Sequence, residues 1–151
     1  MTTKDFLNDV AFAGDLDVAG NLSANTIDSG TWTITIGDGT NSFTGTTQVG
    51  EYQRIGKMVF ISGRISWTGK GSASGGIRLN LPLVCGSDRG MVTLGYIANI
   101  TFTGMIVCSA NAGQSYIVFR DVISGSNPVS LTNTAFGTTG EVQFQMNYFT
   151  T

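Results

Sequence analysis

The sequence predicts an all-β protein, with an N-terminal extended β arm and shaft over residues 1–48 and an antiparallel β-sandwich, jelly-roll-like head over residues 49–151. Three observations favour this fold class. Glycine is abundant, with 21 residues in 151, while only 12% of the residues are charged. Thr, Ser, Ile, Val and Phe recur throughout, which is typical of strands joined by glycine turns. From residue 59 onward, apolar and polar side chains alternate with the period of a half-buried strand.

The head is predicted to be organised around a hairpin at residues 50–67. Gly56 and Lys57 form a two-residue turn candidate, because glycine accepts a positive φ at little steric cost. Residues 52–55 would be the first arm of this hairpin, and the strand after the turn would be the second. The apolar face of the second arm is expected to hold Val59, Ile61, Ile65 and Trp67.

Further strands follow at regular intervals. Residues 31–36 are predicted to form one strand with its apolar side chains on one face. The others are predicted over residues 77–83, 92–98, 100–108, 115–123 and 142–149. Seven or eight short strands separated by turn signals are typical of an antiparallel sandwich or jelly roll. The Gly-rich residues 71–76 are predicted to be a loose loop.

The predicted arm carries a narrow apolar strip. Residues 2–11 have weak helical spacing, and a six-residue unit repeats from residue 12, with Gly-Asp or Gly-Asn turns between apolar residues. A strip this narrow cannot form a core alone, whereas three stacked copies would enclose it. We therefore expect a homotrimer, with a monomeric hairpin as the open alternative. The expected trimer or anchor contacts are Phe6, Leu7, Val10, Phe12, Leu16, Val18, Leu22 and Ile27.

The distribution of charge argues against a nucleic-acid partner. Residues 1–50 hold one lysine and six aspartates, a net charge of −5, and the remainder holds seven basic and four acidic residues, a net charge of +3. These basic residues are scattered, so they predict no patch for a phosphate backbone. No apolar run is long enough for a membrane-spanning helix, and no secretory leader is visible. We expect that the protein does not insert into a membrane and that it assembles in a cytoplasm. Cys85 and Cys108 are expected to be thiols, although a disulfide between them is an open alternative.

The residue types disfavour catalysis and metal binding. The chain contains no histidine, which removes the commonest general base and metal ligand. Two isolated cysteines cannot complete a zinc site, and no phosphate-loop motif is present. Residues 37–41 lack the acidic spacing of a calcium loop, so a turn is favoured. We expect no enzyme activity, no catalytic residue, no cofactor and no metal.

Two sets of side chains in the head are candidates for a functional site. Carboxylates that act in pairs cleave glycosidic bonds, but those of the head are flanked by turn or polar residues and are expected to be solvated. They are Asp88, Asp121, Glu51 and Glu141. Aromatic rings can stack on sugars, but most of those in the head lie at core parity, which favours a core or interface role. They are Tyr52, Trp67, Tyr96, Tyr116 and Tyr148.

Several segments resemble a known family. They are G-E-Y-Q-R-I-G-K-M-V-F-I-S-G-R-I from Gly50, L-P-L-V from Leu81, and the closing N-Y-F-T-T. Together they resemble the β-sandwich heads of tailed-bacteriophage surface proteins, among them tail fibres, receptor-binding proteins and capsid decoration or cement proteins. The run G-D-L-D-V-A-G-N-L-S resembles the repeats of trimeric phage fibre shafts. The family's usual Leu-Pro-Phe strand end appears here as L-P-L, and the resemblance implies no catalytic residues.

These features lead to three hypotheses. The first is a structural protein of a tailed-phage virion, a homotrimer anchored by its arm to capsid or tail proteins with its heads on the virion surface. A capsid decoration or cement protein is slightly favoured over a short tail fibre, because little shaft is present. The alternative is a host-receptor or carbohydrate-binding adhesin, with the loops at residues 70–76, 86–90 and 110–113 binding a host surface glycan. A polysaccharide-cleaving tailspike is least favoured, because neither a long parallel β-helix nor convincing acid residues are visible.

Overall fold

A computed structural model of the chain describes residues 27–86 and 90–151. In these residues it forms ten strands and one short 3₁₀ helix, η1 (Asn133–Ala135). The strands are β1 (Ile27–Thr33), β2 (Ile36–Gly37), β3 (Thr44–Ile55), β4 (Met58–Gly69), β5 (Arg78–Asn80), β6 (Gly90–Ile100), β7 (Met105–Ala110), β8 (Tyr116–Val122), β9 (Val129–Ser130) and β10 (Phe136–Phe149). The predicted all-β class is confirmed. Within the described ranges no helix has the length and apolar character needed to cross a membrane.

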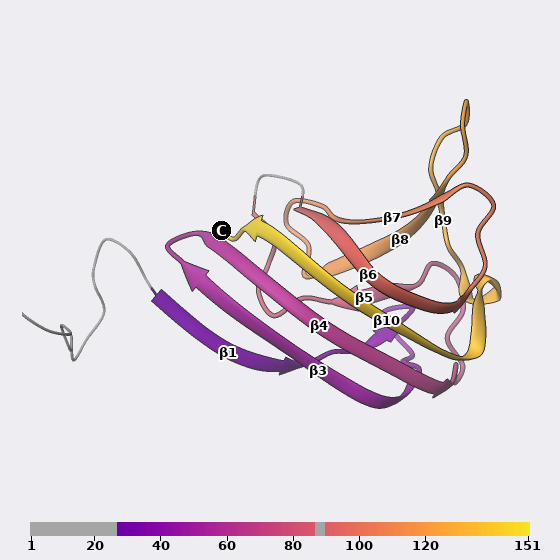
Figure 1. Cartoon of the computed structure of the whole chain (residues 1–151), viewed down its shortest axis with the longest axis horizontal. Coiled ribbons are helices and arrows are strands. Elements are labelled where there is room, and N and C mark those ends of the chain that lie inside the picture. Colours follow the sequence, from indigo (N-terminus) through magenta and orange to yellow (C-terminus); the bar gives the residue numbers. More distant parts are fainter. Residues whose placement is uncertain (1–26, 87–89) are drawn as a thin grey trace, which may run out of the picture.

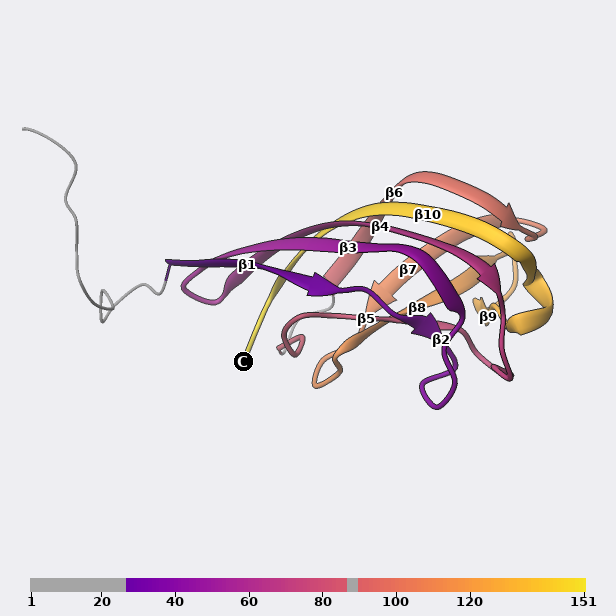
Figure 2. The same ribbon diagram turned by 90° about the horizontal axis from the view of Figure 1, so that it is seen from below.

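The strands join into a single antiparallel sheet that curls on itself. Its order is β1-β3-β4-β10-β6-β7-β8-β5-β2, and β9 pairs with β8. Figure 1 shows the long strands β3, β4 and β10 side by side, and Figure 2 shows β5 and β2 beneath them. Because the strand pairing runs through one continuous sheet, the architecture is a half-barrel. The predicted two-sheet jelly-roll sandwich is not confirmed.

The predicted hairpin of the head is confirmed by β3 and β4. The turn residues are Gly56 and Lys57, the glycine has a φ of 59°, and Ile55 pairs with Met58 across the turn. The apolar face predicted for the second arm is buried, with exposed fractions from 0% for Val59 to 4% for Ile61. Arg64 lies on the opposite, exposed face.

The strand predicted over residues 31–36 is divided in two. β1 pairs with β3, whereas β2 pairs with β5 in the other layer of the curled sheet. The chain passes from one layer to the other between β1 and β2, and the side chain of Asn80 fixes this passage. Its Nδ2 donates to the Thr33 carbonyl (3.1 Å) and its Oδ1 accepts from the Thr35 amide (2.7 Å). The inward orientation was predicted correctly, since Ile34 and Ile36 are 0% and 1% exposed. The continuity of the strand was wrong.

The strand predicted over residues 100–108 is also interrupted. β6 ends at Ile100 and β7 begins at Met105, so the residues between them form a connecting loop. The carboxylate of Asp121 on β8 holds this loop, accepting from the amides of Thr103 (2.7 Å) and Gly104 (2.9 Å). Asp121 is only 8% exposed, so its prediction as a solvated carboxylate was wrong. Its role is to anchor a loop.

The Gly-rich residues 71–76 are held in place, which corrects the prediction of a loose loop. Ala73 is 2% exposed, and its carbonyl accepts a hydrogen bond from the side chain of Asn133. The amide of Ser74 donates to the carboxylate of Asp38 (2.8 Å). The ammonium of Lys70, just before this stretch, donates to two backbone carbonyls near η1 (3.1 and 2.7 Å). These contacts fix the loop, which packs against the core.

The core lies between the two layers of the sheet and is centred on aromatic rings. The ring of Phe136 packs against those of Phe43, Trp67 and Phe119 with centroid separations of 5.5 to 6.0 Å. Tilted and edge-on geometries of this kind are favoured by the quadrupoles of the rings. Cys85 and Cys108 lie in the same core at 0% and 1% exposure and are thiols, as the sequence favoured.

The described part of the predicted arm belongs to the sheet. Residues 27–48 supply β1, β2 and the first part of β3, and Phe43 enters the core at 4% exposure. Ile27, the last of the predicted trimer contacts, begins β1 and is 71% exposed. The other predicted contacts (Phe6, Leu7, Val10, Phe12, Leu16, Val18 and Leu22) lie outside the described residues.

Candidate functional site

The outer face of the sheet is the face of β3, β4, β10 and β6 that points away from the core. Its side chains are arranged in rows that cross the four strands, because directly opposite residues in a sheet point to the same side. The central row consists of Glu51, Ser62, Gln145 and Thr93, one residue from each strand in that order. This row brings together residues that are up to 94 positions apart in sequence, from Glu51 to Gln145.

Two further rows flank the central one. On one side are Gln53, Phe60, Asn147 and Met91, and on the other are Val49, Arg64, Gln143 and Tyr96. Phe60 and Tyr96 are 47% and 51% exposed, so an aromatic ring projects on either side of the polar centre. Two adjoining hollows of about 550 and 640 Å³ lie along these rows and share the four residues of the central row. We call this surface, formed by the three rows, the outer trough.

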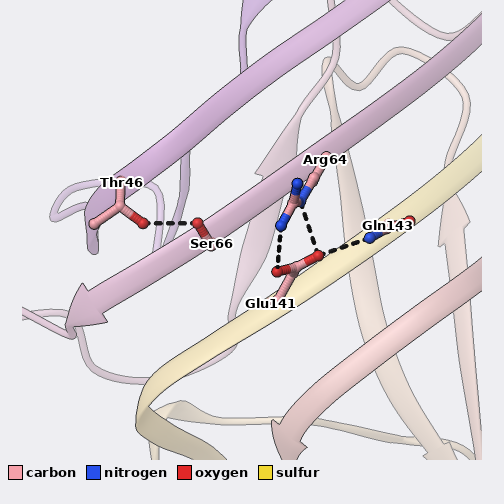
Figure 3. Close-up of polar contacts among 5 residues, drawn as sticks. All are labelled: Thr46, Arg64, Ser66, Glu141 and Gln143. Carbon is pink, nitrogen blue, oxygen red and sulfur yellow. Dashed lines mark hydrogen bonds and ion pairs between the residues drawn. The ribbon is translucent and has the colours of Figure 1, made fainter.

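Arg64 of the outer trough forms an ion pair with Glu141, which lies outside the three rows. The guanidinium of Arg64 donates to both carboxylate oxygens of Glu141, from Nε at 2.8 Å and from Nη2 at 2.9 Å, as Figure 3 shows. The side-chain amide of Gln143 donates to the same carboxylate at 2.7 Å. Hydrogen bonds from Arg64 and then from Gln143 lower the pKa of Glu141, and the hydrogen bond to Glu141 raises the pKa of Arg64. Both groups are therefore charged and engaged with each other at neutral pH.

A second polar contact lies farther along the same face. The hydroxyls of Thr46 and Ser66 are 2.7 Å apart, beyond the row that contains Arg64 (Figure 3). Neither residue lines the hollows of the outer trough. This pair therefore provides a polar feature of the outer face that is separate from the trough.

The aromatic candidates from the sequence divide between the core and the surface. Trp67 and Tyr148 are 1% and 3% exposed, so the predicted core role is correct for them. The hydroxyl of Tyr52 donates to Asp28 (3.3 Å), and the ring of Tyr116 lies 4.6 Å beneath the guanidinium carbon of Arg78. Tyr96 alone among the five candidates is an exposed ring of the outer trough.

The three carboxylate candidates that the structure describes lie on different strands and in different surroundings. Glu141 is engaged by Arg64, and Asp121 is buried under the loop it anchors. Glu51 is exposed in the central row, and Asp88 lies outside the described residues. In residues 27–86 and 90–151, no group of three or more acidic or cysteine side chains is gathered as metal ligands.

The turn at residues 37–41 is an Asp-centred turn, as the sequence favoured. The carboxylate of Asp38 accepts hydrogen bonds from the amides of Thr40 (2.8 Å), Asn41 (2.7 Å) and Ser74 (2.8 Å). Of these backbone donors, that of Asn41 contributes most to holding the pKa of Asp38 far below its ordinary value. All the donors are backbone or amide N–H groups, so the carboxylate acts in structure.

The loops predicted to bind sugar do not surround the outer trough. None of the residues that line its hollows comes from residues 70–76, 86–90 or 110–113. The sequence did assign Ser62 and Arg64 to a polar strand face. It could not place Gln145 and Thr93 beside them, because local alternation fixes the face of a strand but not its neighbours.

No family model matches the sequence, and a search of curated proteins gives no match. Among solved structures, the fold is similar to that of the Dettilon tailspike protein (gp208), with a TM-score of 0.71 and 17% sequence identity. The match covers 83% of this chain and 24% of that one. The chain thus spans about a quarter of that protein's length, and at this identity the likeness concerns the fold.

Proposed function

We propose that this chain is a structural protein of a tailed-phage virion, a homotrimer anchored through its N-terminal arm with its β heads facing outward. The observation that carries the proposal is the fold shared with a tailspike over 83% of the chain. The shaft-like repeat from residue 12 adds independent support, because its apolar strip needs neighbouring copies to enclose it. The expected location is the virion surface.

The sequence is compatible with two positions on the particle, the capsid and the tail, and the fold likeness favours the tail. The small amount of shaft in the sequence slightly favours a capsid decoration or cement protein over a short tail fibre. The similar structure is called a tailspike, and this chain matches a quarter of it. We therefore propose a tail appendage, with tail proteins as the anchoring partners. Gold-labelled antibody on intact particles tests this position, because label on the capsid shell would contradict it.

Light scattering after size exclusion tests the trimer. The wild-type chain, of 15.9 kDa, is expected to elute with three times that mass. Replacing Leu16 and Val18 together by Asp should reduce the mass to that of a monomer, because charges would enter the apolar strip. Val129→Asp is the matched control: Val129 is an apolar residue of the head with 61% exposure, and its replacement should leave the trimer intact. A wild-type monomer at micromolar concentration would overturn the trimer.

The outer trough favours a second function, recognition of the host surface. A polar row between two exposed aromatic rings offers orientation by hydrogen bonds and apolar contact in one surface. Purified protein added to host cells should compete with virions for adsorption. A Thr93→Trp variant, which fills the trough, should lose this competition, and equal competition by wild type and variant would argue against the site.

We further propose that the head binds without cleaving. A glycosidase needs a carboxylic acid whose pKa is raised so that it can donate a proton. At Glu141 the shift is in the opposite direction, because Arg64 stabilises the carboxylate. Incubation with host polysaccharide should therefore release no reducing ends. Release by the wild type that disappears in Glu51→Gln would contradict this proposal.

A further inference from the structure

We infer that the outer trough selects uncharged oligosaccharides over acidic ones. This inference rests on the proposed role in host recognition and adds the chemical class of the ligand. The central row presents Ser62, Gln145 and Thr93 side by side, with Glu51 at one end. Hydroxyl and amide side chains each donate and accept hydrogen bonds. A ligand rich in hydroxyl groups, which also donate and accept, matches this set.

The backbone of the two central strands of the outer trough, β4 and β10, is not available to a ligand. β4 and β10 lie inside the sheet, and each is paired on both sides. An extended peptide gains much of its affinity by adding a strand to an exposed sheet edge, and the two central strands of the trough offer no edge. On these central strands recognition therefore comes from side chains, which favours a ligand that carries its polar groups on its periphery. Carbohydrates have this character.

Phe60 and Tyr96 add apolar contact on the two sides of the polar row. Adjacent rows on one face of a strand are separated by two residues, or about 7 Å, so the flanking rows stand about 13 Å apart. Phe60 on β4 and Tyr96 on β6 are also two strand spacings apart, or about 10 Å, so the two residues lie roughly 16 Å apart on a diagonal. Aromatic rings placed in this way can cover the C–H faces of a ligand while the row between them binds its hydroxyl groups. The arrangement suits an oligosaccharide that lies across the central row.

The charged residues of the outer trough favour neutral ligands over acidic ones. Of the trough residues only Glu51 and Arg64 carry a formal charge. The guanidinium of Arg64 is directed to both oxygens of Glu141, with distances of 2.8 and 2.9 Å. A uronate or sialate would therefore meet a cation that is already paired and would approach the carboxylate of Glu51. Like charges repel, so acidic sugars are disfavoured.

The inference is tested with a printed array of neutral hexose and N-acetylhexosamine oligomers beside uronate- and sialate-containing oligomers. The full-length wild type should bind neutral oligomers only. Gln145→Ala removes an exposed amide from the central row and should weaken that binding at least tenfold. Thr93→Trp should abolish it. Thr46→Ala, which changes a hydroxyl of the outer face beyond the trough, is the matched control and should bind as the wild type does.

A gain of function completes the test. Glu141→Gln removes the counter-charge of Arg64 and should extend binding to the acidic oligomers. Wild-type binding to acidic oligomers, or to no oligomer at all, would overturn the inference while leaving a virion-bound trimer standing. Loss of the trimer in Thr93→Trp would place a neighbouring copy over the trough and would also overturn it. Absence of the protein from virions is a different result, and it would remove the proposed function itself.

Discussion

The indole ring of Trp67 lies against Gly140 on the neighbouring strand so closely that a side chain has no room there. The two residues pair across β4 and β10, and a methyl carbon built on Gly140 would come within 2.1 Å of the ring carbon Cζ2. The ring cannot easily retreat, because its Nε1 donates to the Gly137 carbonyl (3.0 Å) and the core surrounds it. The packing of the sheet at this point requires glycine.

Gly140→Ala should therefore destabilise the fold. Overpacking a tight core lowers the free energy of unfolding by about 1–3 kcal/mol, and the short contact favours the upper part of that range. Chemical denaturation with urea measures the change. Gly95→Ala is the matched control, because its new methyl carbon would have nothing nearer than the Gln143 carbonyl oxygen at 3.9 Å. Equal midpoints for the Gly140 variant and the wild type would contradict the steric argument.

Asp121→Ala should also lower stability. The variant leaves the amides of Thr103 and Gly104 without their acceptor, and a hydrogen bond to a charged group contributes about 1.5–3 kcal/mol. Because the loop can turn these amides to water, we expect a total loss of about 2–3 kcal/mol. Asp121→Asn keeps one acceptor oxygen and should lose roughly half as much. Hydrogen exchange at residues 101–104 should accelerate in both variants, and unchanged exchange would show that the carboxylate does not hold the loop.

Local patterns were sufficient to predict the faces of the strands. The alternation from Val59 to Trp67 depends only on neighbours two residues apart, and the turn at Gly56 depends on a single flexible residue. Both are confirmed. Breaks in the strands depend on distant side chains and were missed. Asn80 acts on Thr35 from 45 positions away, and Asp121 acts on Thr103 from 18 positions away.

The candidate site shows the same division. Alternation assigned Ser62 and Arg64 to the polar face of their strand, and the structure places them there. The sequence could not show which strands lie beside β4 on that face, because β10 is the last strand of the chain yet lies between β4 and β6. Loops were therefore expected to bind sugar, whereas the hollows lie on the sheet. Strand order is a property of the whole chain, and a single sequence does not display it.

The native thiols should react slowly. Burial raises the pKa of Cys108 to about 12, and its side chain is 1% exposed. Thiolate is the reactive form, so the raised pKa keeps Cys108 protonated and therefore unreactive, and burial keeps the reagent away from its sulfur. Ellman's reagent at pH 8 should label native protein only as fast as it unfolds, while guanidinium should release both thiols for labelling. An added surface cysteine, Thr46→Cys, should react at once, and equally rapid labelling of the wild type would contradict the buried core position.

Acid should weaken the fold at the turn that Asp38 organises. Hydrogen bonds from the amides of Asn41, Ser74 and Thr40 hold the pKa of Asp38 far below that of an unfolded aspartate, which is about 3.9. A folded-state pKa that is lowered contributes stability above the unfolded pKa, and this contribution disappears as the pH falls through the folded value. Asp38→Ala should therefore lower the melting temperature most at neutral pH. The gap between wild type and variant should be constant down to about pH 5 and narrow below about pH 4.

Thermal melts of the two proteins at a series of pH values measure that gap directly. Glu51→Ala supplies a matched control, because it removes an exposed carboxylate that lies on a strand face instead of in a turn. Its melting temperature should differ little from the wild type at neutral pH, since surface substitutions away from specific contacts change stability by about 0.5 kcal/mol or less. If the Asp38→Ala gap widened toward low pH, the protonated acid would be the form that the turn prefers. That result would mean that the three backbone N–H groups face a protonated acid. Their distances of 2.7 to 2.8 Å are instead typical of hydrogen bonds to an ionised carboxylate.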